Sequence, residues 1–420
     1  MNIYTSFILF SIVVIYMFKT TADLLNIKNI STDIPEEFNK YFDIKKYTKA
    51  QKYLISNTKF SLISSTFFLI IQIVFIVFGG FNSINKIATS FRFNYILTGL
   101  IFVSILFLIS EILKIPFSIY HTFVIEENFE FNKTTAKIFI TDLLKSWIIN
   151  IMILCIIFSV ILYLFTSNHK NILLYIFMII VIFELFIIFI APVTIMPLFN
   201  KYTPLENGEL KNSIEEYIKK ENFKMKGLFK MDGSKRSTKS NAFFTGFGKF
   251  RRIVLFDTLI NKHTTDELIN ILAHEMGHFK LGHIVKHIIF SFISIGAMLF
   301  TSSFFIYQKW LYAAFFMQSR PIYAGIIFCV FLYTPISFIT SIILNYISRK
   351  YEYQADNYAV TTYEKPEAMV SALKKLSVDN LSNLHPNKLK VFLEYSHPPI
   401  LERIKAIKNI AKINEKLKTK

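Results

Sequence analysis

Long apolar stretches, separated by polar segments of unequal length, dominate the chain. A helix needs about 20 apolar residues to cross the hydrocarbon core of a bilayer. Stretches that reach or approach this length lie near residues 3–18, 60–81, 94–118, 148–166, 172–196, 285–307 and 321–347. The first is short, but the first six residues contain no Lys or Arg, so the basic region of a signal peptide is missing. We interpret it as a retained helix and predict seven membrane spans.

The composition supports a membrane protein. Hydrophobic residues make up 53% of the chain and charged residues only 18%. Soluble globular chains are roughly 45–50% apolar even with Gly counted, so a disordered protein, a coiled coil and an ordinary soluble enzyme are excluded. The two cysteines, Cys155 and Cys329, each lie within an apolar stretch. They form neither a C-x-x-C zinc site nor a disulfide framework.

The positive charges are concentrated in particular segments between the predicted spans. The formal net charge of +18 would raise nucleic acid as a partner of a soluble protein. In a membrane protein, anionic lipids and the positive-inside rule explain it better, and we expect no nucleic acid partner. Lys and Arg number eight in residues 19–59, 16 in 201–286 and 14 after residue 347, and they alternate with sparse connections. This predicts an N-terminus outside, a C-terminus in the cytosol, and a shared side for the long insert and the tail.

A few positions within the spans are polar or conformationally special. Glu184 lies in the middle of the fifth span, where carboxylates usually face a cavity or a partner. Glu111 and Lys114 lie one turn apart near the end of the third span, and we interpret them as an interfacial pair. The pair Gly79-Gly80 interrupts the second span, where it allows helices to approach or to bend.

The motif that carries chemistry is H-E-x-x-H at residues 274–278. Thr264 followed by Glu267 predicts a capping box at the start of a helix through this motif. On that helix His274 and His278 lie on one face and can bind one metal ion. Glu275 is rotated away from both and is suited to act as general base on a water. The alternative is a helix that carries two surface histidines.

A catalytic zinc needs three protein ligands and an open position. The metzincin extension requires Gly and His where this chain has Leu281 and Ile284, so that class is excluded. Glu352, just after the seventh span, is the candidate third ligand. Asp356, four residues later, can orient a ligand histidine through its other ring nitrogen. The alternative for Glu352 is an exposed charge after a membrane helix.

His283 and His287 form another i, i+4 pair close behind the motif. They are compatible with a second metal site, but we favour residues that line the entry of the sixth span.

Taken together, the motifs resemble those of the integral-membrane CAAX prenyl protease 1 family of zinc metallopeptidases. The matching segments are 126–133, 191–193 with 197–200, 241–246, 252–259, 274–278, 352–356, and 396–399 with 402–404. The bacterial HtpX-type quality-control proteases share the zinc motif but are shorter and have fewer spans. One position departs from the family pattern: Glu130 stands where a glycine is expected before Phe131, which affects the local loop and not the chemistry.

The resemblance implies an α-helical polytopic fold. Seven helices surround a water-filled chamber, capped by a mainly helical zincin-type domain with a small β-element. We expect four regions: helices 1–5 with cytosolic loops in 1–196, the zinc-protease insert in 197–284, helices 6–7 in 285–347, and a C-terminal catalytic segment in 348–420.

The resemblance also implies the activity, which is removal of the C-terminal AAX tripeptide from prenylated CAAX proteins by attack of a zinc-activated water. One Zn²⁺ per chain is held by His274, His278 and Glu352. Asn241 holds the substrate backbone beside an edge strand, and His397 and Arg403 stabilise the oxyanion or orient the substrate. From the residues alone, Asn241 is equally a turn residue, His397 a loop histidine and Arg403 one cation of a basic helix.

Two other functions stay open at this point. One is a membrane-protein quality-control zinc protease with HtpX-like activity. The other is a channel or transporter with a structural zinc. The expected partners are prenylated CAAX C-termini and membrane lipids. The protein is expected in the endoplasmic reticulum membrane if eukaryotic and in the inner membrane if bacterial. Its tail, with Lys416 and Lys418 at the fifth and third positions from the end, resembles a dilysine retrieval signal or is simply Lys-rich.

Overall fold

The computed structural model describes residues 3–167, 170–246 and 251–418, so the last two residues of the Lys-rich tail lie outside it. Within these ranges, seven helices are long and apolar enough to cross a membrane, which confirms the predicted helical class and number of spans. They are α1 (Ile3–Lys28), α2 (Ile44–Val77), α4 (Tyr95–Tyr120), α5 (Ala136–Thr166), α6 (Ile172–Ile190), α10 (His283–Phe305) and α12 (Ile322–Tyr363).

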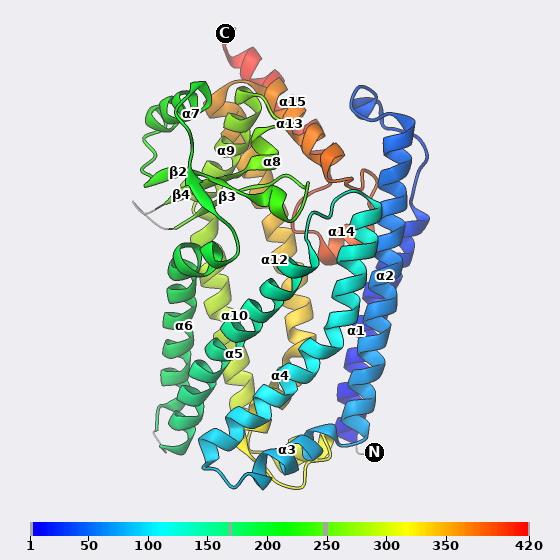
Figure 1. The fold of residues 1–420 in the computed structure, drawn as a ribbon, viewed down its shortest axis with the longest axis vertical. Helices are drawn as coiled ribbons and strands as arrows, with labels where there is room; N and C mark the ends of the chain where they lie inside the picture. The colour runs from blue at the N-terminus through cyan, green and yellow to red at the C-terminus, as the bar shows by residue number, and fades with distance from the viewer. Residues whose placement is uncertain (1–2, 168–169, 247–250, 419–420) are drawn as a thin grey trace.

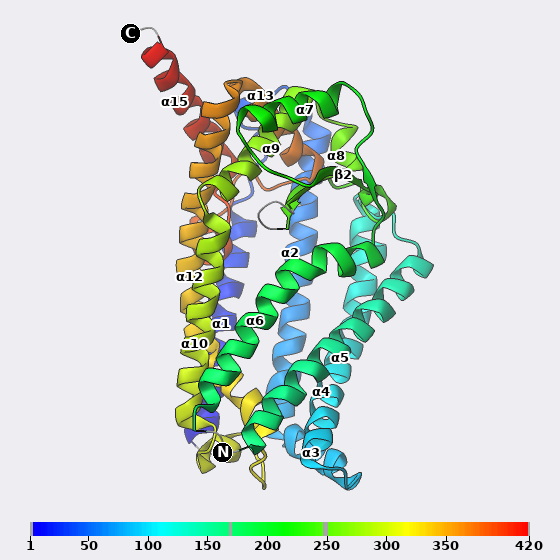
Figure 2. The same cartoon turned by 90° about the vertical axis from the view of Figure 1, so that its left-hand side faces the viewer.

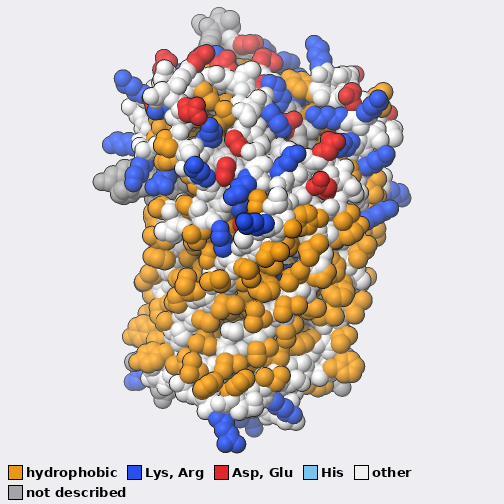
Figure 3. Space-filling view, in the orientation of Figure 1, with side chains coloured by type: hydrophobic (Ala, Val, Ile, Leu, Met, Phe, Trp, Pro, Cys, Tyr) orange, Lys and Arg blue, Asp and Glu red, His pale blue; other side chains and the backbone are white. Residues whose placement is uncertain are grey.

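Most of these helices follow the long axis of the molecule, and the termini lie at opposite ends (Figure 1). Turned by 90°, the molecule shows α1, α10 and α12 lying together, whereas α4, α5 and α6 are inclined to them (Figure 2). Short helices α3 (Gly80–Ser90) and α11 (Lys309–Ala314) lie at the end that holds the N-terminus. The space-filling view shows an apolar band around the membrane helices and many charged side chains at the end that holds the C-terminus (Figure 3).

The predicted interruption of the second span is a true break. Helix α2 ends at Val77, and α3 begins at Gly80 after Gly79 in a left-handed conformation with φ of +68°. This backbone conformation is costly for residues with a Cβ, so glycine suits the position. The chain therefore turns out of the span and runs into α3.

The insert and the tail build a second layer at the C-terminal end. Its helices are α7 (Glu209–Lys220), α8 (Asp257–Ile260), α9 (Thr265–Lys280), α13 (Pro366–Asp379), α14 (Lys388–Glu394) and α15 (Ile400–Lys418). Its strands are β1 (Tyr202–Pro204), β2 (Gly227–Met231), β3 (Ala242–Thr245) and β4 (Arg252–Phe256). The insert and the tail thus meet, as their shared charge pattern predicted.

The strands form one small mixed sheet in the order β1-β2-β4-β3. Strand β4 pairs in parallel with β2, where Leu228 faces Ile253, and antiparallel with β3, where Phe243 faces Val254. The run of buried apolar residues in β4 is typical of a central strand. Strand β3 is left at the edge of the sheet, with one row of backbone groups unpaired by β4.

Two separate apolar cores stabilise the molecule, one at each end. The core at the C-terminal end includes Phe38, Ile214 and Leu272, and the core at the opposite end includes Phe102, Leu162 and Phe328. The spans contribute little buried surface between them. In α12, for example, no residue between Tyr333 and Glu352 is buried. The helices therefore do not pack as a solid bundle at mid-height.

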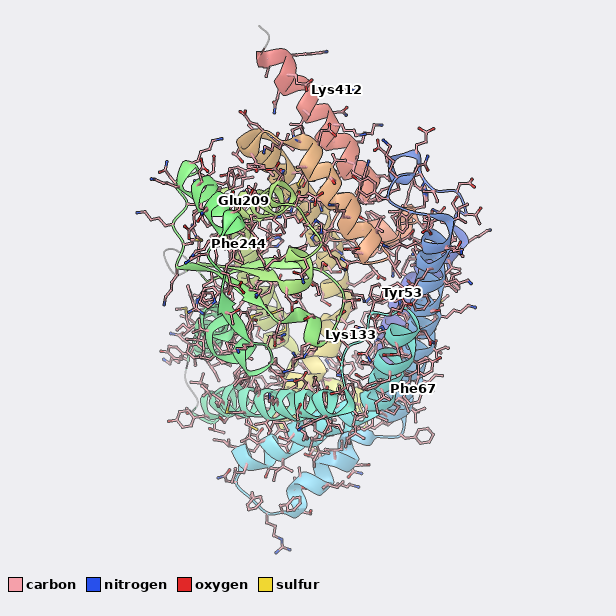
Figure 4. The ribbon with its side chains drawn as sticks, turned by 45° about the horizontal axis from the view of Figure 1, so that its top comes forward. Tyr53, Phe67, Lys133, Glu209, Phe244 and Lys412 are labelled. Atoms are coloured by element: carbon pink, nitrogen blue, oxygen red, sulfur yellow. The ribbon has the colours of Figure 1, made fainter. Side chains whose placement is uncertain are left out.

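A polar cluster joins the membrane helices to the sheet domain. Lys239, shortly before β3, donates hydrogen bonds to Glu126 at 2.7 Å and to the Tyr53 hydroxyl at 2.8 Å. Its ammonium also lies 4.5 Å from the centre of the Phe131 ring. Tyr53 comes from α2, nearer the end that holds the sheet than Phe67 of the same helix (Figure 4). The cluster fixes the segment before β3 against α2 and against the π-helical turn His121–Glu126 that continues α4.

Glu130, which stands where a glycine was expected, adopts a backbone conformation typical of glycine. Glu130 adopts φ of +65° in the connection between α4 and α5. Its carboxylate accepts a hydrogen bond from Lys49 at 2.6 Å, and its carbonyl accepts one from Thr238. The loop geometry is therefore kept despite the side chain.

Candidate metal centre

Helix α9 carries the H-E-x-x-H motif and begins as predicted. The Thr264 hydroxyl accepts from the Glu267 backbone N–H, and the Glu267 carboxylate accepts from the Thr264 N–H, which completes the capping box. The apolar residues of α9 are buried against α12 and α13. The helix is thus held at its start and along one face, so its histidines have a fixed direction.

The structure brings the three predicted ligands together. His274 Nε2 and His278 Nε2 lie 3.2 Å apart. Glu352, on α12, places Oε2 3.4 Å from His274 Nε2 and Oε1 3.3 Å from His278 Nε2. Two helices from distant parts of the chain therefore direct two imidazoles and one carboxylate at a single point.

The donor set fits a divalent metal ion such as zinc. Among the described residues, these three form the one group of His, Cys, Asp or Glu ligand atoms close enough to share an ion. Glu352 is buried, and its Oε2 has no hydrogen-bond partner within the part of the chain that the structure describes. Two histidines and a glutamate are a common ligand set of catalytic zinc, and a metal ion would satisfy the buried oxygen.

Glu275 is not one of the three clustered ligands, as its place on the helix predicts. It is partly exposed, and no hydrogen bond of its carboxylate is recorded among the described residues. Burial raises the pKa of Glu275, and the neighbouring imidazoles of His274 and His278 act in the opposite direction. A carboxylate with a raised pKa beside a metal site is suited to accept and return a proton.

Asp356 and Arg403 stand behind His274. The carboxylate of Asp356 lies 2.8 Å from His274 Nδ1, while Arg403 donates to both of its oxygens at 2.6 and 2.9 Å. Arg403 also lies 3.2 Å from Glu352 Oε2. Burial opposes its charge, but Asp356 and Glu352 raise the pKa of the guanidinium. The network holds two carboxylates and one cation in fixed positions around the ligands.

The structure places the remaining two site residues differently. His397, in the loop between α14 and α15, is 65% exposed and has Nε2 3.3 Å from Glu352 Oε1, so it reaches the site from solvent. Asn241 is exposed just before β3, and its Oδ1 accepts from the Ala242 N–H. Between Asn241 and the ligand group, no contact is recorded in the described ranges. Phe244 of β3 packs on Phe279 of α9, which sets the edge strand beside the motif helix.

His283 was not assigned to the site from the sequence. It lies 3.1 Å from the Nδ1 of His278, ring nitrogen to ring nitrogen. A straight helix would carry a residue five positions on to another face. Gly282, with φ of +69°, breaks the helix and turns His283 back towards His278. A second metal site at His283 and His287 is not found among the described residues.

Comparison with known proteins decides the family. The family model for the CAAX prenyl protease N-terminal region, with five membrane helices, matches residues 23–201, and that for Peptidase family M48 matches residues 204–411. The probable CAAX prenyl protease 1 of Schizosaccharomyces pombe is 37% identical over 388 residues, which cover 89% of this chain and 81% of the relative. The chain belongs to the CAAX prenyl protease 1 family.

Other members of the CAAX prenyl protease 1 family match over most of the length. The Saccharomyces cerevisiae enzyme is 35% identical, with 90% of this chain and 88% of the relative covered. The human homolog is 32% identical, with 90% of each covered. The crystal structure of S. mikatae Ste24p superposes with a TM-score of 0.91 at 33% identity, over 97% of this chain and 99% of that one. The protein is thus an integral membrane metallopeptidase.

Proposed function

We propose that the protein is a zinc endopeptidase that removes the AAX tripeptide from prenylated CAAX proteins. The observation that carries the proposal is the convergence of His274, His278 and Glu352 beside Glu275, in a chain of this family. The relatives are named for this activity. The proposed ligands, base and supporting residues are those expected from the sequence.

Each residue has a role that follows from its position. Zinc, when bound there, lowers the pKa of water towards about 7 and polarises the scissile carbonyl. Glu275 takes a proton from the attacking water and returns it to the leaving amine. His397, which reaches the ligand group from solvent, is proposed to donate a hydrogen bond to the developing oxyanion, a contact often worth about 3 kcal/mol. Arg403 is committed to Asp356 and Glu352, which favours orientation of the ligands as its contribution.

The substrate is proposed to bind as a strand. Within the described residues, the outer edge of β3 has no neighbouring strand and could pair with an extended peptide, and Asn241 stands just before that edge. The lack of buried residues at mid-height of the spans supports an internal chamber bounded by the helices. A prenyl chain would remain in apolar surroundings there while the peptide reaches the metal.

The same proposal includes location and organisation. The C-terminal end with the metal site faces the cytosol, and the N-terminus lies outside or in the lumen, in agreement with the distribution of Lys and Arg. The endoplasmic reticulum membrane is the proposed site, because the relatives compared above are all eukaryotic. We keep the division into 1–196, 197–284, 285–347 and 348–420 as the proposed arrangement of membrane and catalytic regions.

The test is cleavage of a farnesylated C-A-A-X peptide by the detergent-purified full chain. An unprenylated twin peptide and the variant Glu275→Gln serve as controls. We expect cleavage that depends on the prenyl group and is lost in Glu275→Gln, while zinc remains bound to the variant. Equal cleavage of both peptides would replace the proposal with a quality-control protease. Absence of cleavage with zinc bound would reject the catalytic proposal in favour of a structural zinc.

A further inference from the structure

The two ligand histidines are held in place by different residues. His274 is oriented by Asp356 through Nδ1. His278 also presents Nε2 to the ligand group, so its Nδ1 needs a partner of its own. Metal-bound histidines almost always donate this second ring N–H to an acceptor, which fixes the tautomer and the ring orientation. For His278 the nearby atom is Nδ1 of His283, at 3.1 Å.

The hydrogen bonds of His283 define its own tautomer. Its Nε2 lies 2.9 Å from Oε1 of Gln354, an amide oxygen that accepts only. The proton of His283 therefore sits on Nε2, and its Nδ1 carries a lone pair. That lone pair accepts the Nδ1–H of His278, which leaves the Nε2 lone pair of His278 directed at the metal point. With one proton on His283 Nε2 and one on His278 Nδ1, every hydrogen bond from Gln354 to His278 has one donor and one acceptor.

Packing holds His283 in this orientation. Its side chain is almost fully buried, at 1% exposure. The imidazole stacks on the Tyr351 ring with centroids 4.1 Å apart and an angle of 7° between the planes. Tyr351 and Gln354 both lie on α12, the helix that supplies Glu352. The support for His278 is therefore built from the same helix as the third ligand.

We propose that His283 is a positioning residue for the metal ligand His278. It accepts the Nδ1–H of His278 and so holds the tautomer that presents Nε2 to the metal, and Gln354 fixes His283 in turn. The inference rests on the zinc centre proposed above. It gives His283 a role that its neighbour His287 lacks, since His287 touches the edge of Tyr351 and makes no recorded hydrogen bond to a ligand within the described residues.

The test measures zinc affinity of the metal-free full chain in detergent by competition with a chelator. His283→Phe keeps a ring over Tyr351 but removes the acceptor, and we expect zinc affinity to fall about 10–100-fold. His283→Asn places a carbonyl oxygen near the former Nδ1, and most of the affinity should return. His287→Phe, one turn further along α10, is the matched control and should bind zinc like the parent.

A second pair of variants tests the inference from an exposed position, where folding is not at risk. Gln354→Leu removes the acceptor that fixes His283 and should weaken zinc binding, whereas Gln354→Glu keeps an acceptor and should not. The apparent melting temperature of each metal-free variant reports on folding. Parent-like zinc affinity in both His283→Phe and Gln354→Leu overturns the inference. So does a loss in His283→Asn or His287→Phe as large as that in His283→Phe. Failure of the parent to bind zinc would instead reject the zinc centre itself.

Discussion

The guanidinium of Arg403 and the carboxylate of Asp356 form a buried two-point ion pair, with Nε and one terminal nitrogen each donating to a different oxygen. The oxygen that faces the terminal nitrogen also accepts from His274. Arg403 comes from α15 and Asp356 from α12, so this pair connects the C-terminal helix to the ligand on α9.

The first prediction concerns this pair. Asp356→Asn keeps the shape of the side chain but removes the charge that both His274 and Arg403 face. Zinc affinity should fall about 10–100-fold, and the stability of the fold by about 3–5 kcal/mol, since a buried cation loses its counter-charge. Chelator competition and thermal unfolding measure the two effects. Asp266→Asn, at the partly exposed start of α9, is the control for zinc affinity, because its carboxylate pairs with Lys365 and not with a ligand. Unchanged zinc affinity in Asp356→Asn would contradict the prediction.

The second prediction concerns the close approach of α9 and α12 at Gly277. A Cβ there would lie 3.0 Å from the Ala355 Cα and 3.1 Å from the Tyr358 Cβ, so the helices would have to separate. Gly277→Ala should lower peptidase activity on the order of tenfold, because Glu352 moves with α12 relative to the histidines.

Gly296→Ala is the matched control for that variant. Its added Cβ would meet only Phe177, at the ordinary distance of 3.7 Å. Helix propensity favours alanine over glycine by about 1 kcal/mol, so Gly296→Ala should keep its activity and gain stability. Equal activity in the two variants would show that α9 and α12 tolerate the separation.

The third prediction concerns pH. Burial alone would raise the pKa of Glu267, but hydrogen bonds from Lys375, Ser371 and the Thr264 N–H outweigh it and lower the pKa below its ordinary value of 4.5. A lowered folded-state pKa means that the carboxylate stabilises the fold fully above about 4.5 and loses this effect as pH falls through the folded-state value.

Glu267→Gln should therefore cost about 2 kcal/mol at neutral pH, and its difference from the parent should shrink on acidification. Melting temperatures recorded from neutral pH into the acid range measure this. Glu216→Gln, an exposed carboxylate of α7, should match the parent throughout. A difference between Glu267→Gln and the parent that stays constant with pH would contradict the assignment.

The fourth prediction concerns the loop at Glu130. A residue with a Cβ is strained at φ of +65°, and the exposed ion pair with Lys49 offsets little of that strain. Glu130→Gly should melt a few degrees higher than Glu130→Ala, which loses the ion pair and keeps the strain. Peptidase activity should be the same in both, since the loop lies outside the metal centre. Identical melting temperatures would show that the loop relaxes around the side chain.

Much of the fold followed from the sequence because hydropathy and motif spacing are local properties. The seven spans, the break at Gly79 and the capping box of α9 were all predicted correctly. Several span limits were too short, since helical hydrogen bonds continue beyond the apolar window, whereas the predicted ends of the second, fifth and sixth spans lay beyond the ends of α2, α6 and α10. The predicted seventh span ended at residue 347, whereas α12 continues to Tyr363 and carries Glu352 and Asp356 as its direct extension.

The contacts within the site depend on packing between distant segments, so the sequence predicted them less well. The sequence could not give the distance between the Glu352 carboxylate and the two histidines. It suggested Glu352 as a ligand only through its residue type and its position on the same side of the membrane. The role of His283 depends on a left-handed turn at Gly282 that returns the chain towards His278. His278 and His283 are five residues apart, a spacing that does not predict a contact on a helix. The sequence therefore indicated the i, i+4 pair of His283 with His287 instead.

The continuity of α12 also connects the chemistry to the bilayer mechanically. The helix has 42 residues, a length of about 63 Å, roughly twice the hydrocarbon thickness of about 30 Å. About 25 Å of it separates Pro335, within the span, from Glu352. A change of a few degrees in tilt, the usual response to a thicker or thinner membrane, acts through this lever and displaces the carboxylate by about 1–2 Å. Because α12 is one uninterrupted helix, the segment that crosses the bilayer and the carboxylate of the metal centre belong to the same rigid element, with no loop between them.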